Sequence, residues 1–85
     1  MDYQIEIAPA AHRQIKKLPQ PIQERILQRL EGLVIDPRSE GVVKLSGAED
    51  LYRIRVGDYR IIYAIEDQAL LVLIVKVGHR RDVYR

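Results

Sequence analysis

Three arginines of this 85-residue chain are spaced so that their side chains would share one face of a β-sheet. The stretch 51–66 has the pattern of two strands joined by a tight turn at Gly57 and Asp58. Glycine at the first turn position accepts the positive φ that such turns require. Side chains alternate between the two faces along each strand. One face of the hairpin is therefore predicted to carry Arg53, Arg55 and Arg60.

The chemistry open to these guanidinium groups is the binding of a polyanion. The expected pairing sets Arg55 directly opposite Arg60, and like charges opposite each other destabilise a sheet by roughly 0.2–1 kcal/mol. A chain that only needed to fold would place another residue type there. Planar guanidinium groups bind phosphate oxygens through two parallel hydrogen bonds. The alternative interpretation is an outer sheet face that is simply covered by solvent.

The rest of the chain supplies the elements that position this face. Alternating apolar residues at 3–7 predict a short strand, and Pro9 and Pro21 begin two helices that form a hairpin over 9–35. Residues 36–50 are a long connection. A third strand over 70–77 is apolar on both sides, which predicts a central strand that is covered on both faces.

The predicted fold class is α+β. An N-terminal strand and a helical hairpin precede a three-stranded antiparallel meander, in one small sheet with the helices on one face. The core face of the hairpin would carry Tyr52, Ile54, Val56, Tyr59, Ile61, Tyr63 and Ile65. Residues 1–85 are expected to form a single domain.

Composition and charge narrow the classes of function. The chain contains no cysteine and no apolar run near the ~20 residues of a membrane span, so we expect a cytoplasmic protein without a membrane partner. No motif for a metal or cofactor is present, and none is expected. Residues 51–85 contain seven Lys or Arg and four Asp or Glu, a net +3, whereas residues 1–50 contain seven and eight, a net −1. The positive charge thus lies on the expected sheet.

Four stretches together resemble the RelE family, within the RelE/ParE superfamily of toxin–antitoxin modules. They are Lys44-Leu45-x-Gly47, Tyr52-Arg53-Ile54-Arg55, Gly57-Asp58-Tyr59-Arg60-Ile61-Ile62-Tyr63 and Gly78-His79-Arg80-Arg81-Asp82-Val83-Tyr84. With the helical hairpin, the resemblance spans nearly the whole chain.

The resemblance implies a type II toxin that acts as a ribosome-dependent endoribonuclease. Such toxins cut mRNA in the ribosomal A site and stop translation, and a RelB-like antitoxin neutralises them. Their complexes contact operator DNA only through the antitoxin. By position, the resemblance assigns catalysis to Arg53, Arg55, Arg60, Arg80 and Tyr84, without a metal. RNA contacts are expected from Arg53, Arg55, Lys44, His79 and Arg81.

Two departures from the family bear on proton transfer. The best-known members carry lysine at positions 53 and 55, and they have a longer hairpin turn and a longer C-terminal tail. Arginine stays protonated and has no acceptor, so neither Arg53 nor Arg55 can act as a general base. Tyr84 and His79 remain candidates for acid, base or base-stacking roles. Glu49 and Asp50 are further candidates for proton transfer.

Three other functions stay open at this point. A ParE-like toxin would inhibit DNA gyrase through protein contacts without nuclease activity. A non-catalytic RNA-binding domain is a second alternative, although such sheets usually expose aromatic residues for stacking. An inactive toxin is the third, given the arginines at positions 53 and 55.

Overall fold

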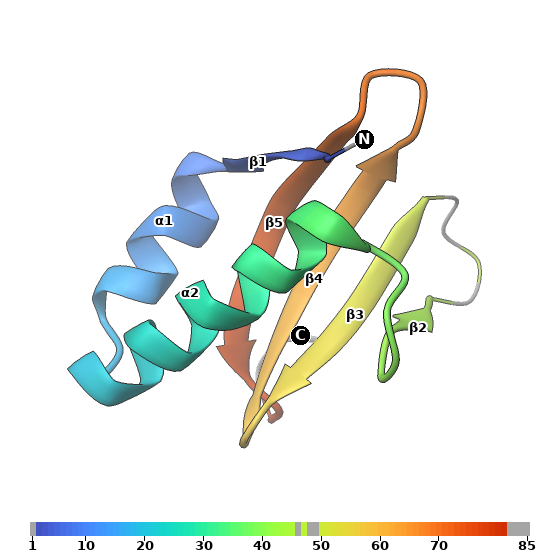
Figure 1. Ribbon diagram of the computed structural model, residues 1–85. Coiled ribbons are helices and arrows are strands. Elements are labelled where there is room, and N and C mark those ends of the chain that lie inside the picture. The colour runs from blue at the N-terminus through green and yellow to red at the C-terminus, as the bar shows by residue number, and fades with distance from the viewer. Residues whose placement is uncertain (1, 46, 48–49, 82–85) are drawn as a thin grey trace.

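The protein folds into a five-stranded sheet with two helices on one face (Figure 1). The structure is a computed structural model, which describes residues 2–45, 47 and 50–81. The elements in chain order are β1 (Gln4–Ile7), α1 (Pro9–Lys16), α2 (Gln20–Ile35), β2 (Val43–Lys44), β3 (Leu51–Val56), β4 (Tyr59–Glu66) and β5 (Leu71–His79). The strand order is β1-β5-β4-β3-β2. The predicted α+β class, the helical hairpin and the antiparallel β3-β4-β5 meander are confirmed. Neither helix has the length and apolar character needed to cross a membrane.

The β3–β4 hairpin has the predicted register. Arg55 pairs with Arg60, and Tyr52 pairs with Tyr63, whose rings stack with centroids 6.0 Å apart. Gly57 has φ +58° at the first turn position, as a type II′ turn requires. Because the register is fixed by a two-residue turn, the side chains of both arms fall on the expected faces.

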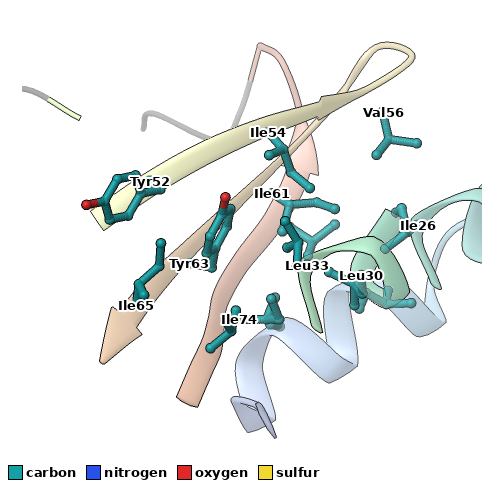
Figure 2. Close-up of a cluster of buried hydrophobic side chains, with 14 residues drawn as sticks. Ile26, Leu30, Leu33, Tyr52, Ile54, Val56, Ile61, Tyr63, Ile65 and Ile74 are labelled. Carbon is teal, nitrogen blue, oxygen red and sulfur yellow. The ribbon is translucent and has the colours of Figure 1, made fainter. Parts of the chain in front are cut away.

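The hydrophobic core lies between the helices and the adjacent face of the sheet. Ile26, Leu30 and Leu33 of α2 meet the strands at helical spacing, and Ile61 and Tyr63 are fully buried opposite them (Figure 2). Tyr59 is the exception among the predicted core residues. It is only half-buried, and its ring packs edge-on against His79 at 5.7 Å. Burial on this face leaves the opposite face free to carry charge.

Two features of the sheet were not predicted. The short strand β2 extends the sheet beyond β3, and β1 pairs with β5 in parallel, which makes the sheet mixed. Where β1 ends, α1 takes over the edge of β5, because the side-chain oxygen of Gln14 accepts a hydrogen bond of 2.7 Å from the Val77 N–H. Buried backbone donors of this kind need a partner. The helix therefore completes the sheet edge near the end of β5.

The central strand β5 contains a β-bulge. Ile62 pairs with Lys76 and Tyr63 pairs with Ile74, so Val75 is an extra residue without a partner in β4. The bulge lets Ile74 and Val77 both reach the core although they are three residues apart. The central position of β5 is confirmed. The expected cover on both faces is wrong for the described part of the chain, since Leu71 and Leu73 are only partly buried.

The long connection after α2 is held by a polar cluster at the end of the sheet where β4 turns into β5. The Arg38 guanidinium binds both carboxylate oxygens of Asp67 at 2.9 Å, and its Nε donates to the Tyr52 hydroxyl at 3.3 Å. The Tyr3 hydroxyl donates to Asp67 Oδ1 at 2.6 Å. The buried Tyr63 hydroxyl donates to the Pro37 carbonyl at 2.7 Å. Residues 37 and 38 are thereby tied to β3, to β4 and to the turn between β4 and β5.

The same cluster predicts a pH dependence of stability. The hydrogen bonds from Arg38, and then from Tyr3, lower the pKa of Asp67 from 3.8 to about 2. A carboxyl whose pKa is lower in the folded state stabilises the fold above its unfolded pKa, and this contribution is lost as the pH falls through the folded pKa. We expect Asp67→Asn to lower the urea midpoint at pH 7. The gap from the wild-type protein should narrow between pH 4 and pH 2.

The neighbouring carboxylate provides a matched control. Glu66→Gln removes the same charge one residue away, from an exposed side chain, and should leave the urea midpoint nearly unchanged. A gap between Asp67→Asn and the wild-type protein that stays constant down to pH 2 would contradict the predicted role of the carboxylate.

Candidate functional site

The arginine-bearing face of the hairpin combines one buried and two accessible guanidinium groups. Arg60 is 8% exposed, the one charged side chain that is buried among the described residues, whereas Arg53 is half-buried and Arg55 is exposed. The Nη1 atom of Arg60 donates to the carbonyl of Tyr59 at 3.4 Å. Burying a charge is costly unless the protein supplies compensating polar groups. Arg60 is thus a cation held within the fold, with Arg55 directly across the strand pair.

The end of β5 brings a fourth arginine to the same end of the hairpin. Gly78 pairs with Arg60, and the backbone N–H of Arg80 donates to the carbonyl of Asp58 in the turn at 2.8 Å. This bond fixes the chain beyond the strand close to Gly57 and Asp58. Arg80 and Arg81 are both exposed there. The backbone of Arg80 therefore lies beside the hairpin turn.

Two predicted RNA contacts lie on the other side of the sheet. His79 pairs with Tyr59, on the face that also carries Ile61, and its Nδ1 accepts a hydrogen bond of 3.2 Å from the Arg81 N–H. Lys44 pairs with Tyr52, so Val43 takes the position beside Arg53. The structure does not bring either residue to the arginine-bearing face. When Nδ1 accepts a hydrogen bond, the proton of the neutral imidazole ring is on Nε2.

The remaining candidates contribute no described geometry to this face. Tyr84 and Glu49 lie outside the described residues. Asp50 is exposed with φ +62°, and its carbonyl accepts a hydrogen bond from the Ile65 N–H at 3.1 Å. Within the described ranges, no three His, Cys, Asp or Glu side chains gather as a metal site.

Sequence reasoning missed three residues of α2 that line a groove beside β3. One cavity of about 350 Å³ is lined by Arg25, Gln28, Arg29, Arg55, Val56 and Gly57. A second, of about 500 Å³, is lined by Arg29, Glu40, Gly41, Arg53 and Arg55. We call the two cavities together the arginine groove, after Arg25, Arg29, Arg53 and Arg55. The i, i+4 spacing of Arg25 and Arg29 was the available signal, but it does not tell which way they face.

The sequence of this chain matches a known protein family. Residues 5–84 match the family model described as the ParE toxin of the type II toxin–antitoxin system parDE. Toxin RelG of Mycobacterium tuberculosis is 31% identical over 86 residues, which cover 100% of this chain and 99% of the relative. The mRNA interferase toxin RelE of Escherichia coli strain K12 is 30% identical over 88 residues, covering 99% and 92%.

Solved structures of RelE toxins have the same fold as this chain. The isolated RelE toxin of E. coli aligns with a TM-score of 0.81 and 28% identity, over 91% of this chain and 83% of that one. The archaeal RelE–RelB complex from Pyrococcus horikoshii aligns with a TM-score of 0.83 and 32% identity, over 98% and 100%. The family model, the relatives and the shared fold lead to one conclusion: this chain belongs to the RelE family of toxins in type II toxin–antitoxin systems.

Proposed function

We propose that this chain is an endoribonuclease that cleaves mRNA in the ribosomal A site and thereby stops translation in the cytoplasm. The observation that carries the proposal is the pairing of buried Arg60 with exposed Arg55, next to the turn that anchors Arg80. Two relatives bear the name mRNA interferase, in E. coli and in Shigella flexneri. Their names favour RNA cleavage over the gyrase inhibition expected of a ParE-like toxin.

The proposed reaction uses the RNA itself as the nucleophile. The 2′-oxygen attacks the adjacent phosphorus, a P–O bond forms, and the bond to the 5′-oxygen of the next nucleotide breaks. The products are a 2′,3′-cyclic phosphate and a 5′-hydroxyl. One proton must leave the 2′-hydroxyl and one must reach the departing 5′-oxygen. No metal is assigned to either step.

The arginines supply charge to this reaction. We assign Arg60 and Arg80 to the scissile phosphate, where fixed cations stabilise the extra negative charge of the five-coordinate transition state. Arg53 and Arg55 bind the same phosphate or its neighbours. A buried cation such as Arg60 needs little reorganisation when that charge develops, because its position is already set by the fold.

Proton transfer is assigned to Tyr84, with the ribosome completing the site. The four arginines cannot accept a proton at neutral pH. Tyr84 would work as acid or base if the neighbouring cations lower its pKa from the ordinary value of about 10. With few proton-transfer groups of its own, the toxin depends on the ribosome to align the mRNA. Contacts of Lys44, His79 and Arg81 with RNA remain predictions.

A RelB-like antitoxin is the proposed inhibitor. Solved relatives include the intact E. coli RelBE toxin–antitoxin complex and the archaeal RelE–RelB complex. We expect the antitoxin to cover the arginine-bearing face, because the proposed substrate contacts that face. Contact with operator DNA would come only through the antitoxin.

An in vitro translation reaction tests the proposal. Wild-type toxin is added to ribosomes translating a defined mRNA, and new 5′ ends are mapped by primer extension. We expect new ends within A-site codons, found only when ribosomes are present, and fewer of them with Tyr84→Phe. Unchanged translation without new ends would overturn the ribonuclease proposal, and a gyrase supercoiling assay would then test the ParE-like alternative. Equal cleavage of naked RNA would contradict the ribosome dependence alone.

A further inference from the structure

The arginine groove is open along the edge of the sheet. β2 pairs with β3 only at Tyr52 and Arg53, so the edge of β3 beyond Arg53 faces the groove and α2. Arg29 and Arg55 line both cavities, which are therefore adjacent. Arg55 is also the partner of Arg60 across the hairpin. The groove therefore includes the cross-strand neighbour of Arg60, the residue to which the scissile phosphate is assigned.

Arg29, which lines both cavities of the groove, is held by neutral groups. Nη1 of Arg29 donates to the Ser39 hydroxyl at 3.3 Å, and Nη2 donates to the Glu40 carbonyl at 3.0 Å. These acceptors orient the guanidinium without neutralising its charge. Arg25 lies over the turn, and a Cβ built on Gly57 would be 3.5 Å from its Nη1 atom. The side chain is thereby placed within the groove.

The charge balance of the groove favours an anion. Four arginines and one carboxylate, that of Glu40, are among the residues that line the two cavities. Arg25 and Arg29 are four residues apart on one helix, where like charges destabilise by roughly 0.2–0.5 kcal/mol. Arg55 and Arg60, paired across β3 and β4, add a second unfavourable pair of like charges. Two such pairs, one on the helix and one on the sheet, favour a site that binds an anion.

The lining favours nucleic acid over a protein partner. Cores of protein interfaces combine arginine with aromatic and other apolar residues. Among the described residues that line the groove, Val56 has the one large apolar side chain. Positively charged grooves that follow a phosphate backbone are the usual means of binding single-stranded RNA without regard to sequence.

We propose that the arginine groove is a second phosphate-binding site, in which Arg25 and Arg29 hold the RNA backbone next to the phosphate that is cleaved. The inference rests on the proposed ribonuclease function and extends it to α2. Arg25 and Arg29 contact the RNA at a phosphate that does not react. They therefore contribute to affinity for the substrate rather than to the chemical step.

Salt-dependent RNA binding by the whole protein tests the site. Binding of a short labelled 2′-O-methyl RNA, which cannot be cleaved, is measured by fluorescence anisotropy across a series of salt concentrations. Loss of one phosphate contact on a single strand reduces the slope of log K against log salt by about 0.7. We expect that change for Arg25→Gln, together with roughly three- to tenfold weaker binding at low salt. Arg25→Lys should retain most of the slope, because it keeps the charge.

Arg13→Gln is the matched control. It removes the same charge from an exposed arginine of α1 that does not line the groove, and it should leave slope and affinity unchanged. On ribosomes, Arg25→Gln should raise KM while kcat stays at the wild-type value. Thermal unfolding of each variant verifies that the protein is folded, and Arg25 is preferred to Arg29 because Arg29 also holds Ser39 and Glu40.

The outcomes separate this inference from the function on which it rests. If Arg25→Gln behaves like Arg13→Gln in both assays while the wild-type toxin cleaves mRNA, the second site is wrong and the ribonuclease proposal stands. If the wild-type toxin does not cleave mRNA on ribosomes, the ribonuclease proposal itself is overturned. Binding of a labelled acidic antitoxin peptide is measured by the same anisotropy method. If Arg25→Gln weakens binding of this peptide but not of RNA, the groove is an antitoxin site and the RNA inference is overturned.

Discussion

Arg60→Ala is expected to reduce cleavage of mRNA on ribosomes by roughly 10²–10³-fold, the usual cost of removing one preorganised group that stabilises transition-state charge. The loss should appear in kcat, because Arg60 is assigned to the phosphate whose charge increases during the reaction. Single-turnover cleavage, with toxin in saturating excess over mRNA-bearing ribosomes, measures the rate of the chemical step. Arg60→Lys should recover part of the rate, since lysine keeps the charge and loses the planar fork.

The burial of Arg60 requires a control for folding. Near-ultraviolet circular dichroism and the urea midpoint show whether Arg60→Ala and Arg60→Lys keep the native structure. Arg13→Ala provides the matched arginine substitution on an exposed part of α1 and should cleave at the wild-type rate. A folded Arg60→Ala protein that cleaves as fast as Arg13→Ala would remove Arg60 from the proposed site.

The largest expected effect on stability comes from Leu33→Ala. Leu33 is fully buried between α2 and the sheet (Figure 2), and replacing a buried leucine by alanine costs about 2–5 kcal/mol. A domain of this length has about 4–13 kcal/mol of total stability, so the variant loses a large part of it. Urea unfolding, followed by circular dichroism at about 222 nm, measures the change in the free energy of unfolding.

Leu27 offers the same substitution on the outer side of the same helix. It is 48% exposed, and Leu27→Ala should change the free energy of unfolding by less than about 1 kcal/mol. Equal losses for Leu27→Ala and Leu33→Ala would show that α2 is not oriented on the sheet as described. The comparison needs the slope of the unfolding curve to be the same in both variants.

The hairpin and the helices could be predicted because their patterns are local. The two-residue turn at Gly57 fixes every pair from Leu51 to Val56, and alternation then assigns the faces. The apolar spacing of Ile26, Leu30 and Leu33 identifies the buried side of α2 without knowledge of its partner. For these elements, sequence and structure agree.

The parts that could not be predicted depend on long-range placement. β2 has two residues, too few to show a period, and only its pairing decides that Lys44 lies away from Arg53. The entry of Arg25 and Arg29 into a groove depends on how α2 is positioned against the edge of β3. The burial of Arg60 likewise results from packing around a residue whose type predicts exposure.

The bulge at Val75 also determines where the toxin can change length during evolution. Because Val75 is the residue without a partner in β4, its deletion would leave a regular strand in which Ile74 and Val77 still face the core. A deletion before the bulge would instead move the preceding side chains to the opposite face. Relatives that are one residue shorter in this strand are therefore expected to align with a gap at Val75. Such a gap keeps Gly78 beside Arg60 and Arg80 at the hairpin turn.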